Sequence, residues 1–87
     1  MVIEWSEEKE AVLMELRGIS LTLISKEINA GRYDIEPNPS RDGQVLFIVT
    51  LPNIKNLIGA PAVPTANGYF LKTAYESRKL SKARGKR

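Results

Sequence analysis

The chain has 87 residues and a formal net charge of +3, with neither cysteine nor histidine. A chain of this length forms one domain and buries only about 60% of the surface that it exposes when unfolded. Disulfides and thiolate chemistry are excluded, and a zinc site would need an all-oxygen ligand set, so we expect no metal and no other cofactor.

Positive charge is concentrated at the C-terminal end. Residues 72–87 hold seven of the thirteen basic residues and one of the ten acidic residues, which gives +6 here and −3 in residues 1–71. Cations bind phosphates, and aromatic rings such as those of Tyr69, Phe70 and Tyr75 stack on bases. The basic C-terminal segment therefore indicates a nucleic-acid partner.

The N-terminal third predicts two short helices. Ser6 and Ser20 are typical N-cap residues, and Gly18 and Gly31 are typical stop signals. The first expected helix spans residues 7–17, and the second has about ten residues between Ser20 and Gly31. Apolar side chains at helical spacing are expected to face the core, namely Val12, Leu13, Leu16, Leu21, Ile24 and Ile28.

The middle of the chain predicts strands. Residues 44–51 are rich in Val, Ile and Phe and apolar on both faces, which is typical of a central strand. Residues 32–36 are expected to precede it as a second strand, with a turn at 37–43. Residues 2–5 alternate between apolar and polar side chains and predict either a short edge strand or a lead-in.

The C-terminal third contains an expected loop and a final strand. Residues 52–67 include three prolines and no periodicity, so we expect a long loop. Residues 69–75 predict a strand with alternating faces, in which Leu71 and Tyr75 share one face and Lys72 lies on the other. A helix at 76–83 and a frayed tail at 84–87 are expected to follow. The single domain 1–87 is expected to be α+β, with two N-terminal helices packed on a three- to four-stranded antiparallel sheet.

Three segments carry a likeness to a known family: Ile3-Glu-Trp-Ser-Glu-Glu-Lys9 with Arg17-Gly-Ile-Ser20, Asp42-Gly-Gln-Val-Leu-Phe-Ile-Val49, and Phe70-Leu-Lys-Thr-Ala-Tyr-Glu-Ser-Arg78. They resemble the opening, the central strand and the final strand of BrnT-type toxins. The third is also similar to the Thr-Ala-Tyr segments of RelE-like and colicin-type ribonucleases. The chain departs from the pattern with Ser6 where Asp is usual, Arg17 where His is common, and a loop inserted before the last strand.

The resemblance implies a RelE-like fold and the toxin half of a type II toxin–antitoxin pair, a metal-independent endoribonuclease that a cognate antitoxin neutralises. Such cleavage needs no histidine, because the ribose 2′-OH attacks the adjacent phosphate and cations stabilise the charge that develops. We expect catalysis by Lys72, Tyr75 and Arg78, with Lys72 as base and Tyr75 or Glu76 as alternates. RNA contacts are expected from Arg41, Thr73, Ser77, Lys79, Lys82 and Arg84.

Two other interpretations stay open. In the first, a non-catalytic RNA-binding or ribosome-associated module uses the basic end only to hold phosphate. In the second, a structural adaptor docks a protein partner on an exposed apolar loop at residues 54–58. The longest apolar run, residues 45–51, is too short to span a bilayer, and the N-terminus lacks the pattern of a signal peptide, so we expect a cytoplasmic protein. The sequence leaves open whether the RNA is mRNA on the ribosome, and whether the chain forms a homodimer or a hetero-oligomer with its antitoxin.

Overall fold

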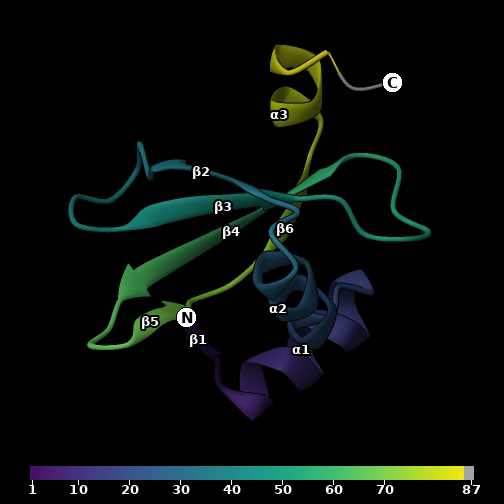
Figure 1. The fold of residues 1–87 in the computed structure, drawn as a ribbon. Coiled ribbons are helices and arrows are strands. Elements are labelled where there is room, and N and C mark those ends of the chain that lie inside the picture. The colour runs from purple at the N-terminus through teal and green to yellow at the C-terminus, as the bar shows by residue number, and fades with distance from the viewer. Residues whose placement is uncertain (86–87) are drawn as a thin grey trace.

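The computed structural model describes residues 1–85 as three helices and a mixed sheet (Figure 1). The elements are, in order, β1 (Val2–Glu4), α1 (Glu7–Arg17), α2 (Leu21–Asn29), β2 (Asp34–Pro37), β3 (Val45–Val49), β4 (Leu57–Pro64), β5 (Gly68–Leu71), β6 (Tyr75–Ser77) and α3 (Arg78–Ala83). The strand order is β1-β5-β4-β3-β2, and β6 pairs with β4 beyond the end of β5. The expected α+β class is confirmed. The expected three- to four-stranded antiparallel sheet is wrong, because the sheet has six strands and β1 runs parallel to β5.

Serine caps begin both N-terminal helices, as predicted. The hydroxyls of Ser6 and Ser20 each accept a hydrogen bond from the backbone N–H three residues further on. Gly18 follows α1 with a φ of 66°, a left-handed conformation that glycine adopts without strain. Both predicted helices are confirmed, and α1 has the predicted bounds.

The predicted apolar stripe of α1 is only partly buried. Leu13 packs in the core, whereas Val12 is 47% and Leu16 is 74% exposed. Of the three predicted side chains of α1, Leu13 is therefore the one that contributes to the core. The stripe of α2 is buried as predicted, with Leu21, Ile24 and Ile28 in the core.

Residues 57–64 form the inner strand β4, so the expected loop at 52–67 is wrong over half its length. This strand pairs with β3 on one side and with β5 and β6 on the other. Proline is rare inside a sheet because it has no N–H to donate. The carbonyl of Pro61 accepts from the N–H of Lys72 (2.8 Å), so the missing donor of Pro61 faces the gap between β5 and β6, where the ladder is already interrupted.

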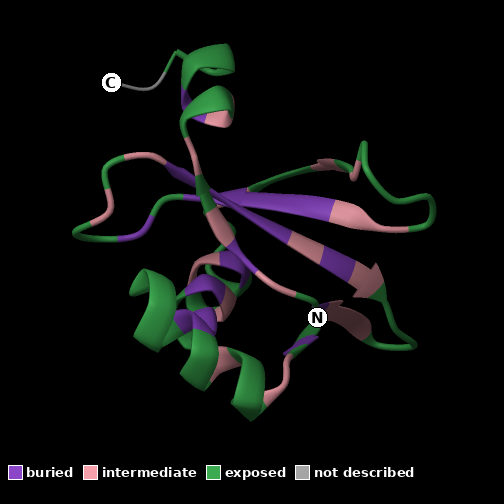
Figure 2. Ribbon diagram, turned by 180° about the vertical axis from the view of Figure 1, so that it is seen from behind, coloured by how far each residue is buried: buried purple, intermediate pink, exposed green. Residues whose placement is uncertain are grey.

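The two faces of the sheet carry separate apolar clusters. Helices α1 and α2 pack on one face, over alternate residues of β3 and β4 such as Phe47, Ile58 and Ala60. On the other face, Leu57 and its neighbours on β3 meet α3. Figure 2 shows the buried strands between exposed outer helix surfaces. Because Leu57 and Ile58 are buried, the expected exposed apolar loop at 54–58 is wrong, and the adaptor interpretation loses its docking surface.

The C-terminal helix starts later than expected. The hydroxyl of Ser77 accepts from the N–H of Leu80, which makes Ser77 the N-cap and Arg78 the first helical residue. Arg84 forms ion pairs with Asp34 and Glu36 on β2, so the expected frayed tail does not begin at this residue. Residues 86–87 of that tail lie outside the described part of the chain. Within residues 1–85, no helix has the length and apolar character needed to cross a bilayer.

Candidate nucleic-acid interface

A β-bulge separates β5 from β6 and sets the positions of the expected catalytic residues. On β4, two residues (60 and 61) lie between the partners of Leu71 and Tyr75, whereas three residues (72, 73 and 74) lie between Leu71 and Tyr75 themselves. The extra residue shifts the alternation of faces. Leu71 packs toward α1 and α2, while Tyr75 packs on the opposite face. The prediction that both side chains share a face is therefore wrong.

Arg17 fixes this bulge from the end of α1. Its Nη1 atom donates to the carbonyl oxygen of Ala74 at 2.7 Å, across 57 positions of sequence. A bulge leaves backbone groups without ladder partners, and a buried carbonyl without a partner is costly. The side chain of Ala74 is itself fully buried. Arg17 thus stabilises the backbone between Lys72 and Tyr75, a contact that sequence patterns did not indicate.

Two of the predicted catalytic residues, Lys72 and Tyr75, and two of the predicted RNA contacts, Arg41 and Thr73, line one cleft, which we call the hairpin cleft. It has a volume of about 300 Å³ and lies between the β2–β3 connection and the bulge, with these lining residues: Asn38, Ser40, Arg41, Gln44, Pro61, Lys72, Thr73 and Tyr75. Among these described residues, two are basic and none is acidic. The hairpin cleft therefore presents two cations, hydroxyls and side-chain amides to a ligand, a set suited to phosphate.

Both walls of the hairpin cleft are held by local contacts. The side-chain oxygen of Asn38 accepts from the N–H of Ser40 (3.0 Å), and its amide donates to the side chain of Gln44 (3.3 Å). These bonds shape the turn that presents Arg41. On the other wall, Tyr75 lies directly opposite Gly59 in the β4–β6 ladder. The absence of a side chain at Gly59 gives the tyrosine ring its room, since a Cβ there would lie 3.0 Å from the ring.

Three of the four remaining predicted cations, Arg78, Lys79 and Lys82, lie in a second cleft, which we call the α3 cleft. It has a volume of about 420 Å³ and these lining residues: Lys55, Asn56, Arg78, Lys79, Ser81 and Lys82. Arg78, predicted to act with Lys72 and Tyr75, lines only this cleft among the cavities described here. The single catalytic centre expected from the sequence is thus divided between two clefts. Lys55 was not predicted, because residues 52–56 follow no regular pattern.

Three further residues have roles other than those expected. Ser77 caps α3, and Arg84 pairs with carboxylates of β2, so neither group is free for RNA in the way predicted. Tyr69 packs edge-on against Phe47 with ring centroids 5.0 Å apart, which places it in the core and not on a base. Phe70 stays half-buried, and the Lys72 ammonium lies 5.9 Å from its ring centroid.

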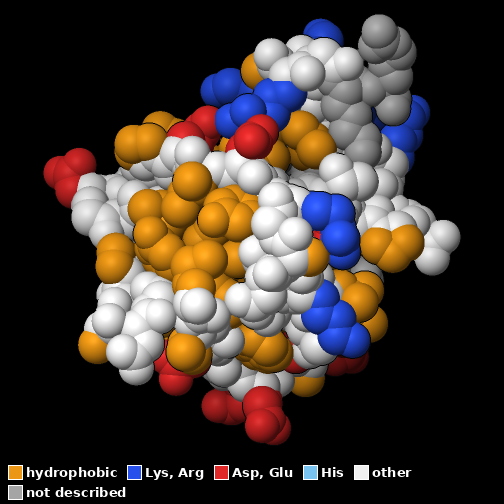
Figure 3. Space-filling view, in the orientation of Figure 1, with side chains coloured by type: hydrophobic (Ala, Val, Ile, Leu, Met, Phe, Trp, Pro, Cys, Tyr) orange, Lys and Arg blue, Asp and Glu red, His pale blue; other side chains and the backbone are white. Residues whose placement is uncertain are grey.

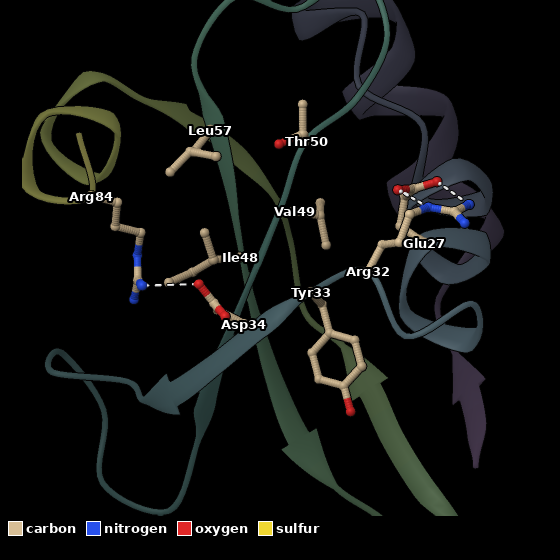
Figure 4. Close-up of a pocket in the computed structure, with 9 residues that line it drawn as sticks. All are labelled: Glu27, Arg32, Tyr33, Asp34, Ile48, Val49, Thr50, Leu57 and Arg84. Carbon is tan, nitrogen blue, oxygen red and sulfur yellow. Dashed lines mark hydrogen bonds and ion pairs between the residues drawn. The ribbon is translucent and has the colours of Figure 1, made fainter. Parts of the chain in front are cut away.

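A third cavity, of about 420 Å³ beside the start of β2, is electrically balanced (Figure 4). Arg32 pairs with Glu27 at 3.0 Å, and Arg84 pairs with Asp34 at 3.0 Å. Each cation in this cavity thus already has a carboxylate partner. An anion that entered would compete with these carboxylates, so the two basic clefts are the stronger candidates for a phosphate ligand.

Charge also differs between the ends of the molecule. In Figure 3, basic side chains gather toward the end that carries α3, and several acidic side chains lie at the opposite end, near α1. The first turn of α1 alone contains Glu7, Glu8 and Glu10. Such a gradient orients an approaching polyanion toward the basic end.

Comparison with protein-family models, curated proteins and solved structures gives no match to this chain. The function is therefore inferred from the lining residues and the geometry of the hairpin cleft and the α3 cleft.

Proposed function

We propose that the protein binds single-stranded RNA in the hairpin cleft and cleaves the strand held there without a metal ion. The observation that carries this proposal is the convergence of Arg41, Lys72, Thr73 and Tyr75 on one concave surface. Two cations and no lining carboxylate favour a phosphate, and the half-buried ring of Tyr75 offers a surface for a base. Single-stranded RNA presents both groups at once.

The same side chains supply what the reaction requires. The ribose 2′-OH loses its proton and bonds to phosphorus, the P–O5′ bond breaks, and the leaving oxygen takes up a proton. Products are a 2′,3′-cyclic phosphate and a 5′-hydroxyl. The amine of Lys72 would take the proton of the 2′-OH, and the Tyr75 hydroxyl would give its proton to the leaving O5′. Arg41 and the Lys72 ammonium formed in this way would stabilise the charged phosphorane. Arg17 acts as a positioning residue through its bond to the bulge.

The sequence likeness extends this proposal to a RelE-like or BrnT-like toxin that an antitoxin partner holds inactive in the cytoplasm. Two N-terminal helices on one face of a sheet, with the basic cleft on the other side, support that assignment. A short neighbouring reading frame that encodes a DNA-binding antitoxin would support it further. Co-expression of its product would then suppress RNA cleavage by the purified protein.

The test uses end-labelled single-stranded RNA and its all-2′-deoxy counterpart. The wild type should shorten the RNA and should bind the deoxy strand without cutting it, because that strand has no attacking hydroxyl. Arg41→Gln and Lys72→Gln should each lower the cleavage rate by about 10²- to 10³-fold. Lys26→Gln is the matched control, since Lys26 is an exposed lysine on α2. If the cleft variants cut at the rate of the control variant, the proposed site is wrong.

A second candidate function is RNA binding without cleavage. The separation of Arg78 from Lys72 favours it, because fewer cations then surround any one linkage. In this case the wild type retards labelled RNA in a gel but leaves its length unchanged. Arg41→Gln would weaken binding and reduce its salt dependence by about 0.7 for one lost phosphate contact on a single strand.

A further inference from the structure

Two sets of hydrogen bonds hold the walls of the α3 cleft together. The backbone N–H and the side-chain amide of Asn56 both donate to Oε2 of Glu76, at 3.0 and 2.9 Å. The N–H of Leu57 donates to the hydroxyl of Ser81 at 2.7 Å, and this hydroxyl donates to the carbonyl of Ser77. The segment that carries Lys55 is thereby attached to β6 and to α3, so Lys55 is held beside the cations of α3.

Four cations and no carboxylate line this cleft among the described residues: Lys55, Arg78, Lys79 and Lys82. The acidic side chain nearest in sequence, Glu76, is already engaged by Asn56. The pKa of Glu76 is lowered first by the hydrogen bonds from Asn56 and then by the charges of Arg78 and Lys55. The lining side chains are otherwise polar, Asn56 and Ser81, so the cleft offers no apolar anchor of the kind that protein partners use. A polyanion is the ligand that fits.

The hairpin cleft and the α3 cleft lie at the two ends of one short strand. Tyr75 lines the hairpin cleft, Arg78 lines the α3 cleft, and β6 joins them. Three residues of extended chain span about 10 Å. In double-stranded DNA, successive phosphates of one strand lie about 3.4 Å apart along the axis. If the bound RNA is stacked with this spacing, the distance corresponds to about three nucleotides.

We infer that the α3 cleft holds the phosphates of the same RNA strand about three nucleotides away from the linkage in the hairpin cleft. This inference rests on the proposed function and deepens it by defining the substrate class. The preferred ligand is a single strand of at least about four nucleotides, the lower end of the site sizes of single-strand-binding domains. A dinucleotide is too short to contact both clefts and occupies only the hairpin cleft.

The test compares the affinity of the full chain for a dinucleotide and for a strand of about eight nucleotides. Both ligands are 2′-deoxy at the cleavable positions, and fluorescence anisotropy is followed over a range of salt concentration. The variant is Lys55→Gln with Lys79→Gln, two exposed side chains, and Lys26→Gln is again the control. We expect the variant to lose several-fold more affinity for the longer strand than for the dinucleotide. Its salt slope should fall by about 1.4, the value for two contacts at about 0.7 each.

Three other results would contradict either the α3-cleft inference or the proposed function. If the variant binds the longer strand as tightly as the control does, while Arg41→Gln weakens that binding, the α3-cleft inference is wrong and the hairpin cleft stands. Equal losses for both lengths also overturn it, because the added cations then act only through net charge. If the wild type binds neither strand at low salt, the proposed function fails together with the inference.

Discussion

Gly59→Ala is expected to displace the Tyr75 ring and slow RNA cleavage without unfolding the sheet. A Cβ at position 59 would lie 3.0 Å from Cε1 and Cζ of Tyr75 and 3.1 Å from its hydroxyl oxygen. Carbon atoms pack best at about 3.5–4.0 Å, so the ring must move by about 0.5–1 Å. The contact atoms are the far end of a side chain at the cleft surface, which allows the ring to move toward the cleft.

The displacement sets the size of the effect. A misplacement of about 1 Å in a group that acts on substrate costs up to ~10²-fold in rate, whereas overpacking costs about 1–3 kcal/mol of stability. Single-turnover cleavage rates should therefore fall by about 10- to 100-fold, with a cooperative unfolding transition retained. Urea unfolding of the same samples measures the stability change.

Tyr75→Phe provides the control, because it keeps the ring and removes the hydroxyl. If Gly59→Ala acts by moving that hydroxyl, the double variant should cleave no more slowly than Tyr75→Phe alone. The reasoning is refuted if Gly59→Ala cleaves at the wild-type rate, or if it slows Tyr75→Phe by a further 10-fold or so.

Three other predictions concern contacts around the two clefts. Arg17→Met removes the donor to the carbonyl of Ala74. The free energy of unfolding in urea should therefore fall by about 1–3 kcal/mol, and the affinity for RNA should fall as well. An unchanged urea midpoint would show that Arg17 does not stabilise the bulge. Arg84→Gln breaks partly exposed ion pairs and should cost at most about 1 kcal/mol, with RNA affinity like that of Lys26→Gln, whereas a larger loss of affinity would place Arg84 in the interface. Burial raises the pKa of Glu10, but hydrogen bonds from Thr22, Trp5 and Ser20 together bring it below its ordinary value of 4.5. The folded state therefore favours the carboxylate, and this stabilisation is present above pH 4.5 and is lost as the pH falls through the lowered pKa. Thermal unfolding should show Glu10→Gln less stable than the wild type at pH 7, with the difference shrinking below about pH 4.5; a difference that is constant with pH would contradict it.

Local signals predicted the helices and the first hairpin well. Serine hydroxyls and Gly18 define α1 and α2 through contacts within a few residues, so they can be recognised from the sequence. The strand β4 was missed because Gly59, Pro61 and Pro64 are typical of loops. Pro61 is tolerated because the segment that faces its nitrogen is the bulge at residues 72–74, where the ladder needs no N–H donor. No pattern within residues 57–64 indicates that a bulge lies there.

The candidate site was predicted in composition but not in arrangement. The basic residues and Tyr75 were identified from charge and from the Thr-Ala-Tyr segment, and Arg41 was placed among them. One extra residue between Leu71 and Tyr75 places Tyr75 on the face opposite to that of Leu71. Strict alternation predicts that both side chains lie on the same face. Lys55 lies in the same cleft as Arg78 because Asn56 bonds to Glu76 and Leu57 bonds to Ser81, and these contacts depend on tertiary structure.

The attachment of Arg17 to the carbonyl of Ala74 has a consequence during protein synthesis. The first helix and the last strands must both leave the ribosome before this tie can form, and β1 likewise waits for β5. Contacts so distant along a chain form late in folding. A nascent polypeptide that stops short of Gly68 lacks the bulge and one wall of the hairpin cleft. The hairpin cleft therefore assembles only after residues 72–75 have been synthesised, and a chain that ends before them cannot form it.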